Sequence, residues 1–156
     1  MTVKFRNLDI SPDQPVEAWP GEAVQTAIER GSLNEWRRLM AAVRRDPWGR
    51  TARQIEQALA ISRPYGIAPA LERAIEAVRR EQAERERQAV AERVRRLIEA
   101  SGLTRAEFAA RIGTSPSRLS TYATGKVVPS AAMLVRMEQL VSDSTPRQHA
   151  REAGRC

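Results

Sequence analysis

One short stretch of this 156-residue chain carries side chains whose types and spacing suit hydrogen bonding to another molecule. They are Pro116, Ser117, Arg118 and Thr121, and a helix over this stretch turns all four outward if Leu119 faces inward. Arginine is a planar cation with several donors, and the hydroxyl groups of serine and threonine both donate and accept. Short polar side chains beside an arginine match the edges of bases in the major groove of DNA. We therefore expect residues 116–121 to face bases.

Capping residues predict the two helices that would position these side chains. Thr104 and Glu107 have the spacing of a capping box, in which the hydroxyl accepts from the first-turn amides and the carboxylate reaches back. Gly113 would end this first helix. Ser115 is a suitable N-cap for a second helix, with Pro116 at the first helical position, where its missing N–H removes no bond. The stretch therefore predicts a helix, a tight turn and a second helix over residues 115–124.

The apolar spacing indicates that these two helices pack against each other. The first helix would present an apolar face made of Phe108, Ala109 and Ile112. The second would present one made of Leu119, Tyr122 and Ala123. Packing of the two faces leaves the four candidate base-contacting residues on the outside.

Residues 103–130, LTRAEFAARIGTSPSRLSTYATGKVVPS, resemble the helix-turn-helix family of the lambda-repressor and Cro type, also called XRE-like. The matching residues are Leu103, Thr104, Phe108, Ala109, Gly113, Ser115, Leu119, Ser120, Gly125, Lys126, Pro129 and Ser130. The resemblance implies an all-α domain of about five helices over residues 90–141 that binds double-stranded DNA.

The resemblance also implies a role for individual side chains. Bases would be contacted by Pro116, Ser117, Arg118 and Thr121. The sugar-phosphate backbone would be contacted by Thr104, Arg105, Ser115, Ser120 and Lys126.

Two positions depart from the family pattern. Arg105 stands where the family often has glutamine, which should strengthen a phosphate contact without adding sequence reading. Ala123 stands where a glutamate often precedes the exit loop, so we expect a looser loop. Because Pro116 donates no hydrogen bond, specificity should depend mainly on Arg118 and Thr121, helped by the shape of the DNA.

Charge and cysteine content limit the class of protein. The chain has 26 basic and 19 acidic residues, and residues 89–141 hold eight basic against four acidic side chains, whereas residues 1–88 hold fifteen against thirteen. The excess of positive charge is thus densest where DNA contacts are expected. A single cysteine, Cys156, excludes an intramolecular disulfide and a cysteine-cluster metal site, and a reducing cytoplasm is the natural compartment. The chain shows neither an apolar run of membrane-spanning length nor a signal segment.

The sequence shows no arrangement typical of catalysis. Neither a nucleophile with a base nor a glycine-rich phosphate loop stands out, and the sole histidine, His149, lies in residues 142–156, which we expect to be a disordered tail. We therefore expect no enzyme activity, cofactor or metal site.

Residues 20–78 are predicted to form a small helical module. One helix would run from Pro20 to about Arg30, a second would begin at the capping box of Ser32 and Glu35, and a third would be capped by Thr51 and Gln54. The second helix has an apolar stripe made of Leu33, Trp36, Leu39, Met40 and Val43.

We expect this thin module to gain buried area by self-association. Its core or dimer interface would be made of Trp36, Leu39, Met40, Val43 and Trp48. A ligand pocket lined by tryptophan is the less favoured alternative. Residues 1–19 precede the module and, with alternating apolar residues followed by prolines, are predicted to be an extended arm.

Three segments of this half, WPGEAVQTAIERG, NEWRRLMAAVRRDPWG and SRPYGIAPALERAI, resemble helical regions attached to helix-turn-helix domains in high-GC bacteria. This resemblance implies a bacterial source, but it implies no activity for the module.

No glycine or proline interrupts residues 70–100, which predicts one long helix. Its first apolar residues would join the module and its last, Val90, Val94, Leu97 and Ile98, would join the helix-turn-helix domain. Residues 79–89 between them are almost all polar, with nearly balanced charge and glutamate–arginine pairs four residues apart. This pattern favours a solvated helical strut over a nucleic-acid-binding stripe.

Together these observations predict an all-α protein with a helical module, a charged connecting helix and a C-terminal five-helix helix-turn-helix domain. The function they favour is a cytoplasmic, sequence-specific regulator of transcription, a homodimeric repressor that binds double-stranded DNA. One alternative is an antitoxin that represses its own operon and masks a protein toxin, which a copurifying small partner would favour. Another is an architectural protein that bridges DNA with little sequence preference.

Overall fold

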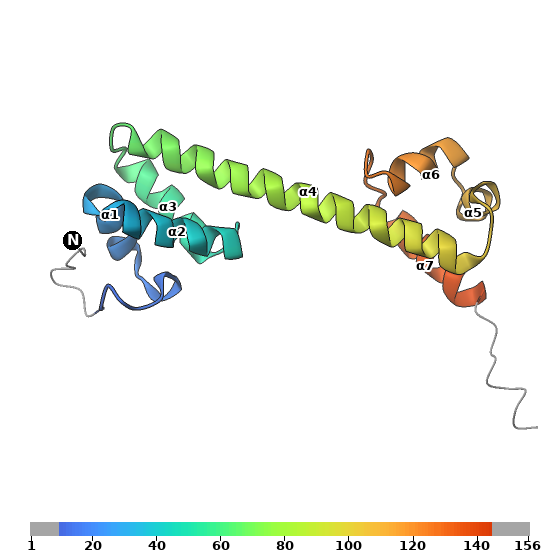
Figure 1. Ribbon diagram of the computed structural model, residues 1–156, viewed down its shortest axis with the longest axis horizontal. Coiled ribbons are helices and arrows are strands. Elements are labelled where there is room, and N and C mark those ends of the chain that lie inside the picture. The colour runs from blue at the N-terminus through green and yellow to red at the C-terminus, as the bar shows by residue number, and fades with distance from the viewer. Residues whose placement is uncertain (1–9, 145–156) are drawn as a thin grey trace, which may run out of the picture. The chain divides into compact units, whose positions relative to one another are not determined.

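A computed structural model of the chain describes residues 10–144, in which α-helices are the dominant element (Figure 1). The α-helices are α1 (Gly21–Arg30), α2 (Leu33–Arg45), α3 (Arg50–Ile61), α4 (Ile67–Ser101), α5 (Arg105–Ile112), α6 (Pro116–Ala123) and α7 (Ala131–Ser144), and a 3-10 turn, η1 (Val16–Ala18), precedes them. No strand occurs in this part of the chain, so the all-α prediction is confirmed. The disordered tail was predicted to begin at residue 142, but α7 continues to Ser144; residues 1–9 and 145–156, with His149 and Cys156, lie outside the described residues.

The chain divides into two compact units, Met1–Ala83 and Glu84–Cys156, and each has its own apolar core. The long helix α4 contributes to both cores. Its first turns place Leu71, Ile75 and Val78 in the core of the first unit, and its last turns place Val94 and Ile98 in the core of the second. One long helix over this region was predicted, and it is confirmed.

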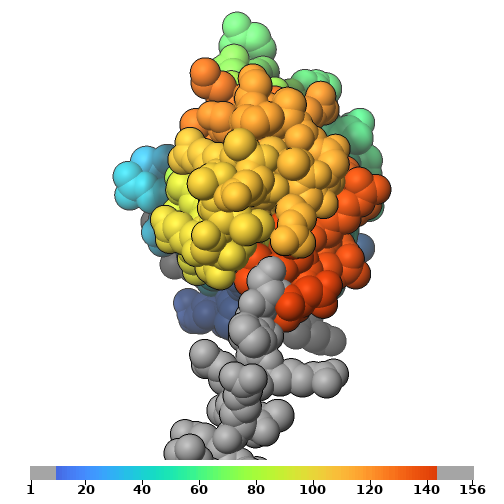
Figure 2. All heavy atoms as spheres, turned by 90° about the vertical axis from the view of Figure 1, so that its right-hand side faces the viewer, coloured from blue at the N-terminus to red at the C-terminus, as the bar shows by residue number. Residues whose placement is uncertain are grey.

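The second unit consists of the end of α4 with α5, α6 and α7, so within the described residues this unit has four helices, one fewer than the five that the resemblance implies. Residues 125–130 connect α6 to α7 as a loop. In the space-filling view, atoms of α5, α6 and α7 meet on one face of this unit (Figure 2). Met137 of α7 is fully buried and packs in the same core as Phe108 of α5 and Leu119 of α6.

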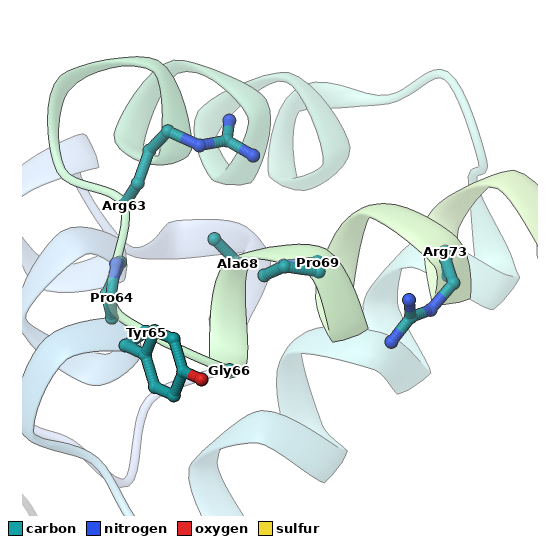
Figure 3. Close-up of a pocket in the computed structure, with 7 residues that line it drawn as sticks. All are labelled: Arg63, Pro64, Tyr65, Gly66, Ala68, Pro69 and Arg73. Carbon is teal, nitrogen blue, oxygen red and sulfur yellow. The ribbon is translucent and has the colours of Figure 1, made fainter.

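The first unit packs α1, α2 and α3 with the start of α4. Gly66, with φ +76°, lies in the turn from α3 into α4, and a cavity of about 380 Å³ lies beside this turn (Figure 3). Arg63 and Arg73 line the cavity, but Arg63 donates two hydrogen bonds to Glu72, at 2.7 and 3.0 Å. One of the two arginines that line the cavity is therefore engaged within the unit.

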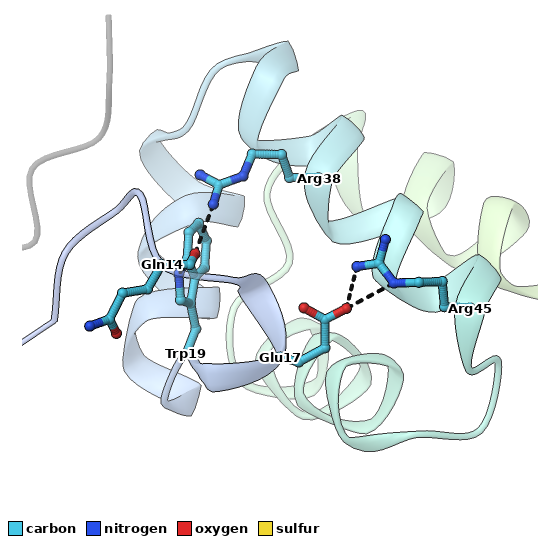
Figure 4. Close-up of polar contacts among 5 residues, drawn as sticks. All are labelled: Gln14, Glu17, Trp19, Arg38 and Arg45. Carbon is cyan, nitrogen blue, oxygen red and sulfur yellow. Dashed lines mark hydrogen bonds and ion pairs between the residues drawn. The ribbon is translucent and has the colours of Figure 1, made fainter.

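Residues 10–19 differ from the extended arm that we predicted. Trp19 is fully buried, its indole N–H donates to the carbonyl of Gln14 at 3.1 Å, and the Arg38 guanidinium lies 4.9 Å from the ring centre (Figure 4). Arg38 also donates to the Gln14 carbonyl at 2.8 Å, and Arg45 pairs with Glu17. The segment folds onto the unit because Trp19 buries a large apolar ring there.

The buried face of α2 is rotated from the stripe that the apolar pattern predicted. Leu39, Met40 and Val43 are buried, but Leu33 is 57% exposed and Glu35 is buried instead. The carboxylate of Glu35 completes the predicted capping box by accepting from the Ser32 amide at 2.8 Å. Because the cap satisfies this carboxylate, a charged residue occupies a core position that a hydrophobic pattern does not count.

The cap predicted for the third helix of the first unit is wrong. Thr51 and Gln54 do not cap α3, which begins at Arg50 with Gly49 as N-cap. Both side chains are buried, and Gln54 donates to the carbonyl of Trp19 at 3.1 Å.

Two tryptophans were also predicted for the core or dimer interface. Trp36 is half-buried and donates to a carbonyl of α1, and Trp48 is 47% exposed.

The two tryptophans at opposite extremes of burial provide a matched test of this core. Trp19→Ala should lower the free energy of unfolding by about 3–5 kcal/mol, because it removes a fully buried ring. Trp48→Ala should lower it by less than about 1 kcal/mol. Urea unfolding followed by far-UV circular dichroism measures both, and equal losses would contradict the central position of Trp19.

Candidate nucleic-acid interface

The first helix of the candidate interface, α5, is anchored by the predicted capping box. The Thr104 hydroxyl accepts from the Glu107 amide at 3.3 Å, and the Glu107 carboxylate accepts from the Thr104 amide at 2.9 Å. The Thr104 hydroxyl also donates to the Glu107 carboxylate at 2.6 Å, and this bond together with the one from the Thr104 amide lowers the pKa of Glu107 below its ordinary value. The cap therefore stabilises α5 fully at pH values above the ordinary pKa of a glutamate. This contribution is lost as the pH falls through the lowered pKa of Glu107.

The turn after α5 is tight because a glycine adopts a left-handed conformation. Gly113 has φ +75° and ψ +42°, a region that residues with a side chain rarely occupy. The Thr114 amide then donates back to the Ala109 carbonyl at 2.9 Å. Ser115 caps α6 by accepting from the Arg118 amide at 3.2 Å, and Pro116 is the first helical residue. The predicted helix, turn and second helix are confirmed.

The apolar faces of α5 and α6 pack as the sequence indicated. All six predicted residues are buried in one core, namely Phe108, Ala109, Ile112, Leu119, Tyr122 and Ala123. This packing determines which side of α6 faces solvent.

The candidate base-contacting residues lie on the opposite side of α6. Pro116, Ser117 and Arg118 are exposed, and Thr121 is half-buried. The Thr121 hydroxyl donates to the Arg118 carbonyl at 2.7 Å, so its proton is used within the helix. What Thr121 offers a base is therefore an acceptor oxygen and a methyl group.

Arg118 is held by a neighbour one helical turn away. Its Nε donates to the Tyr122 hydroxyl oxygen at 2.9 Å, and the guanidinium carbon lies 5.9 Å from the centre of that ring. The hydrogen bond to the Tyr122 hydroxyl raises the pKa of Arg118 above its ordinary value. The apolar pattern predicts Tyr122 only as a core residue, although its spacing of four residues from Arg118 is the spacing of interacting side chains on a helix.

The residues predicted to contact the DNA backbone differ in how free they are. The Thr104 and Ser115 hydroxyl groups are engaged in helix caps, and Ser120 is half-buried. Arg105 and Lys126 are exposed, and neither has an ion pair within residues 10–144. These two cations are thus available to an anionic partner.

Comparison with known protein families agrees with this geometry, because residues 89–141 match the family described as a helix-turn-helix domain. Residues 89–141 are a helix-turn-helix domain. It is of the XRE/Cro-like type, and such a domain indicates a DNA-binding regulator. No curated protein and no solved structure was found to match the chain.

Two other features bear on the setting of the helix-turn-helix domain. No helix among the described residues is both long and apolar enough to cross a membrane. The same residues contain no cluster of three or more histidine, cysteine, aspartate or glutamate side chains that could hold a metal ion.

Helix α4 bonds to the last residue of α6, directly before the exit loop of the helix-turn-helix domain, although we expected a looser loop from Ala123. Arg95 donates from Nη1 to the Ala123 carbonyl at 2.5 Å, and its Nε and Nη2 donate to Glu92 at 3.2 and 2.5 Å. Gly125, with φ +75°, is buried, and a Cβ there would lie 3.3 Å from the Gln88 amide nitrogen. Arg95 therefore makes a contact at the end of α6 that no local pattern in the sequence indicates.

Arg95→Ala should loosen this loop, because it removes a charge-assisted hydrogen bond to the last carbonyl of α6. We expect faster amide hydrogen exchange at Thr124 and Val127, whose amides bond back to α6, and a loss of about 1 kcal/mol in the stability of the domain. Arg96→Ala is the control, since Arg96 lies 3.8 Å from Glu92 and its side chain is 70% exposed. Unchanged exchange at both amides in Arg95→Ala would show that the contact does not hold the loop.

Proposed function

We propose that this protein is a cytoplasmic, sequence-specific regulator of transcription that binds double-stranded DNA as a homodimer and acts as a repressor. The observation that carries the proposal is the exposed first half of α6, held by capped helices and a glycine turn against α5. A helix held in this way presents its N-terminal side chains to the major groove.

The side chains of the domain divide into two roles in this proposal. Arg118, Thr121 and Ser117 read base edges, while Pro116 makes only van der Waals contact. Arg105 and Lys126 neutralise phosphates, because both are exposed cations without ion pairs in the described residues. The capped helix ends at Thr104 and Ser115, together with Ser120, contact the sugar-phosphate backbone.

Dimer formation follows from the size of the reading surface. Helix α6 offers only four candidate base-contacting residues, and single DNA-binding modules bury about 600–1,000 Å² of protein surface, whereas tight specific complexes commonly bury more. A second copy doubles both the contacts and the length of the site. The first unit is the proposed interface, because it exposes the large apolar side chains Leu33, Trp48 and Ile61.

Substitutions of two arginines should separate sequence reading from general DNA binding. A selection from random duplexes identifies the preferred site, and fluorescence anisotropy at several salt concentrations measures affinity for that site and for random duplex. Arg118→Ala should reduce the preference for the selected site by roughly 5- to 150-fold, because a two-donor contact to a base is lost. Arg105→Ala should weaken both duplexes alike and reduce the salt slope by about one.

Arg37→Ala, an exposed arginine of the first unit, is the charge-matched control and should change neither quantity. Equal losses on selected and random duplex for both Arg118→Ala and Arg105→Ala would refute the division of roles. Light scattering of the full chain, alone and with the selected duplex, tests the dimer. A single copy on one half-site would refute the dimer without affecting the proposal of DNA binding.

A further inference from the structure

The contact between Arg118 and Tyr122 constrains how the arginine can approach a base. An arginine side chain can present two parallel donors in two ways, either both terminal amines or Nε with one terminal amine. In this structure the Nε–H of Arg118 already donates to the Tyr122 hydroxyl oxygen at 2.9 Å. Only the edge formed by the two terminal amines is left for a second, bidentate contact.

Tyr122 can impose this constraint because its ring belongs to the core. The residue is 4% exposed and packs with Phe108 and Leu119, while Arg118 is exposed. The acceptor oxygen is therefore positioned by the apolar packing of α5 against α6. An arginine with a fixed acceptor at Nε samples fewer rotamers than one such as Arg105, which has no ion pair among residues 10–144.

We propose that Tyr122 is a positioning residue that holds Arg118 to recognise guanine with its two terminal amines. Guanine presents two acceptors, O6 and N7, side by side in the major groove, and adenine presents one acceptor and one donor at the same edge. Two coplanar donors held in one orientation match guanine and oppose the donor of adenine. The inference rests on the proposed DNA-binding function and adds a base identity and a residue that does not contact the DNA.

Tyr122→Phe tests this role because it keeps the ring and its packing and removes only the hydroxyl group. The test uses the full chain and duplexes that carry guanine or each other base at the position lost in Arg118→Ala. We expect the preference for guanine there to fall by roughly tenfold in Tyr122→Phe, with the affinity for random duplex and the salt slope changed less than about twofold. In an Arg118→Ala background, Tyr122→Phe should have no further effect on preference, since the two residues act through one contact.

The second tyrosine of the chain provides a matched control. Tyr65 is fully exposed in the first unit, and Tyr65→Phe should leave the guanine preference and the stability unchanged. A measurement without DNA completes the test: the Arg118 Nε–H resonance should exchange slowly with water in the native chain and in Tyr65→Phe, and faster in Tyr122→Phe.

The outcomes are distinguishable. Full guanine preference in Tyr122→Phe, or an Arg118 preference for a base other than guanine, would overturn the positioning role and leave the proposed function intact. Equal weakening on selected and random duplex, with a lower thermal stability, would make Tyr122 a packing residue only and would also overturn the inference. Native protein that binds no duplex with preference would refute the proposed function itself, whereas the exchange rate of the Arg118 Nε–H would still show whether Tyr122 holds the side chain.

Discussion

The packing of α5 against α6 is the constraint on which the helix-turn-helix domain depends. Two helices of eight residues each are too short to be stable alone in water, so their shared apolar face must supply the stability. Phe108 and Leu119, both fully buried, form the centre of that face. Gly113 helps to make the packing possible, because its left-handed conformation ends α5 and lets α6 begin after a turn of three residues. The direction of every solvent-facing side chain on α6 follows from this arrangement.

Hydrogen bonds to residues of this core then hold arginine side chains at the surface of the domain. The Tyr122 hydroxyl oxygen receives Arg118 on the reading side of α6, and Arg95 of α4 donates to the carbonyl of Ala123 at the end of the same helix. Each contact joins a buried residue of α6, Tyr122 or Ala123, to an arginine side chain at the surface of the domain. A recognition surface preorganised in this way loses less side-chain freedom on binding than one built from untethered side chains.

The first unit shows the same dependence of polar contacts on a buried ring. Trp19 is fully buried, and Gln54 and Arg38 both bond to the backbone around it, Gln54 to the carbonyl of Trp19 and Arg38 to those of Pro12 and Gln14. These bonds hold the segment before α1 against the unit. The exposed apolar side chains of this unit, by contrast, lie in turns and at helix ends, where packing within one chain does not reach them.

Local sequence was enough to predict the caps, the turn and the buried faces of α5 and α6, because each depends on residues within about four positions of one another. Tertiary structure decided the rest. Arg95 bonds to Ala123 across 28 positions and Gln54 bonds to Trp19 across 35, and no periodic pattern in the sequence predicts contacts over such separations. The face of α2 was misjudged for a related reason, since a hydrophobic pattern does not count a carboxylate such as Glu35 that its own cap allows to be buried. The physical difference is one of range: caps and glycine turns act along the chain, whereas a side chain that bonds to a distant carbonyl is placed only after the helices have packed.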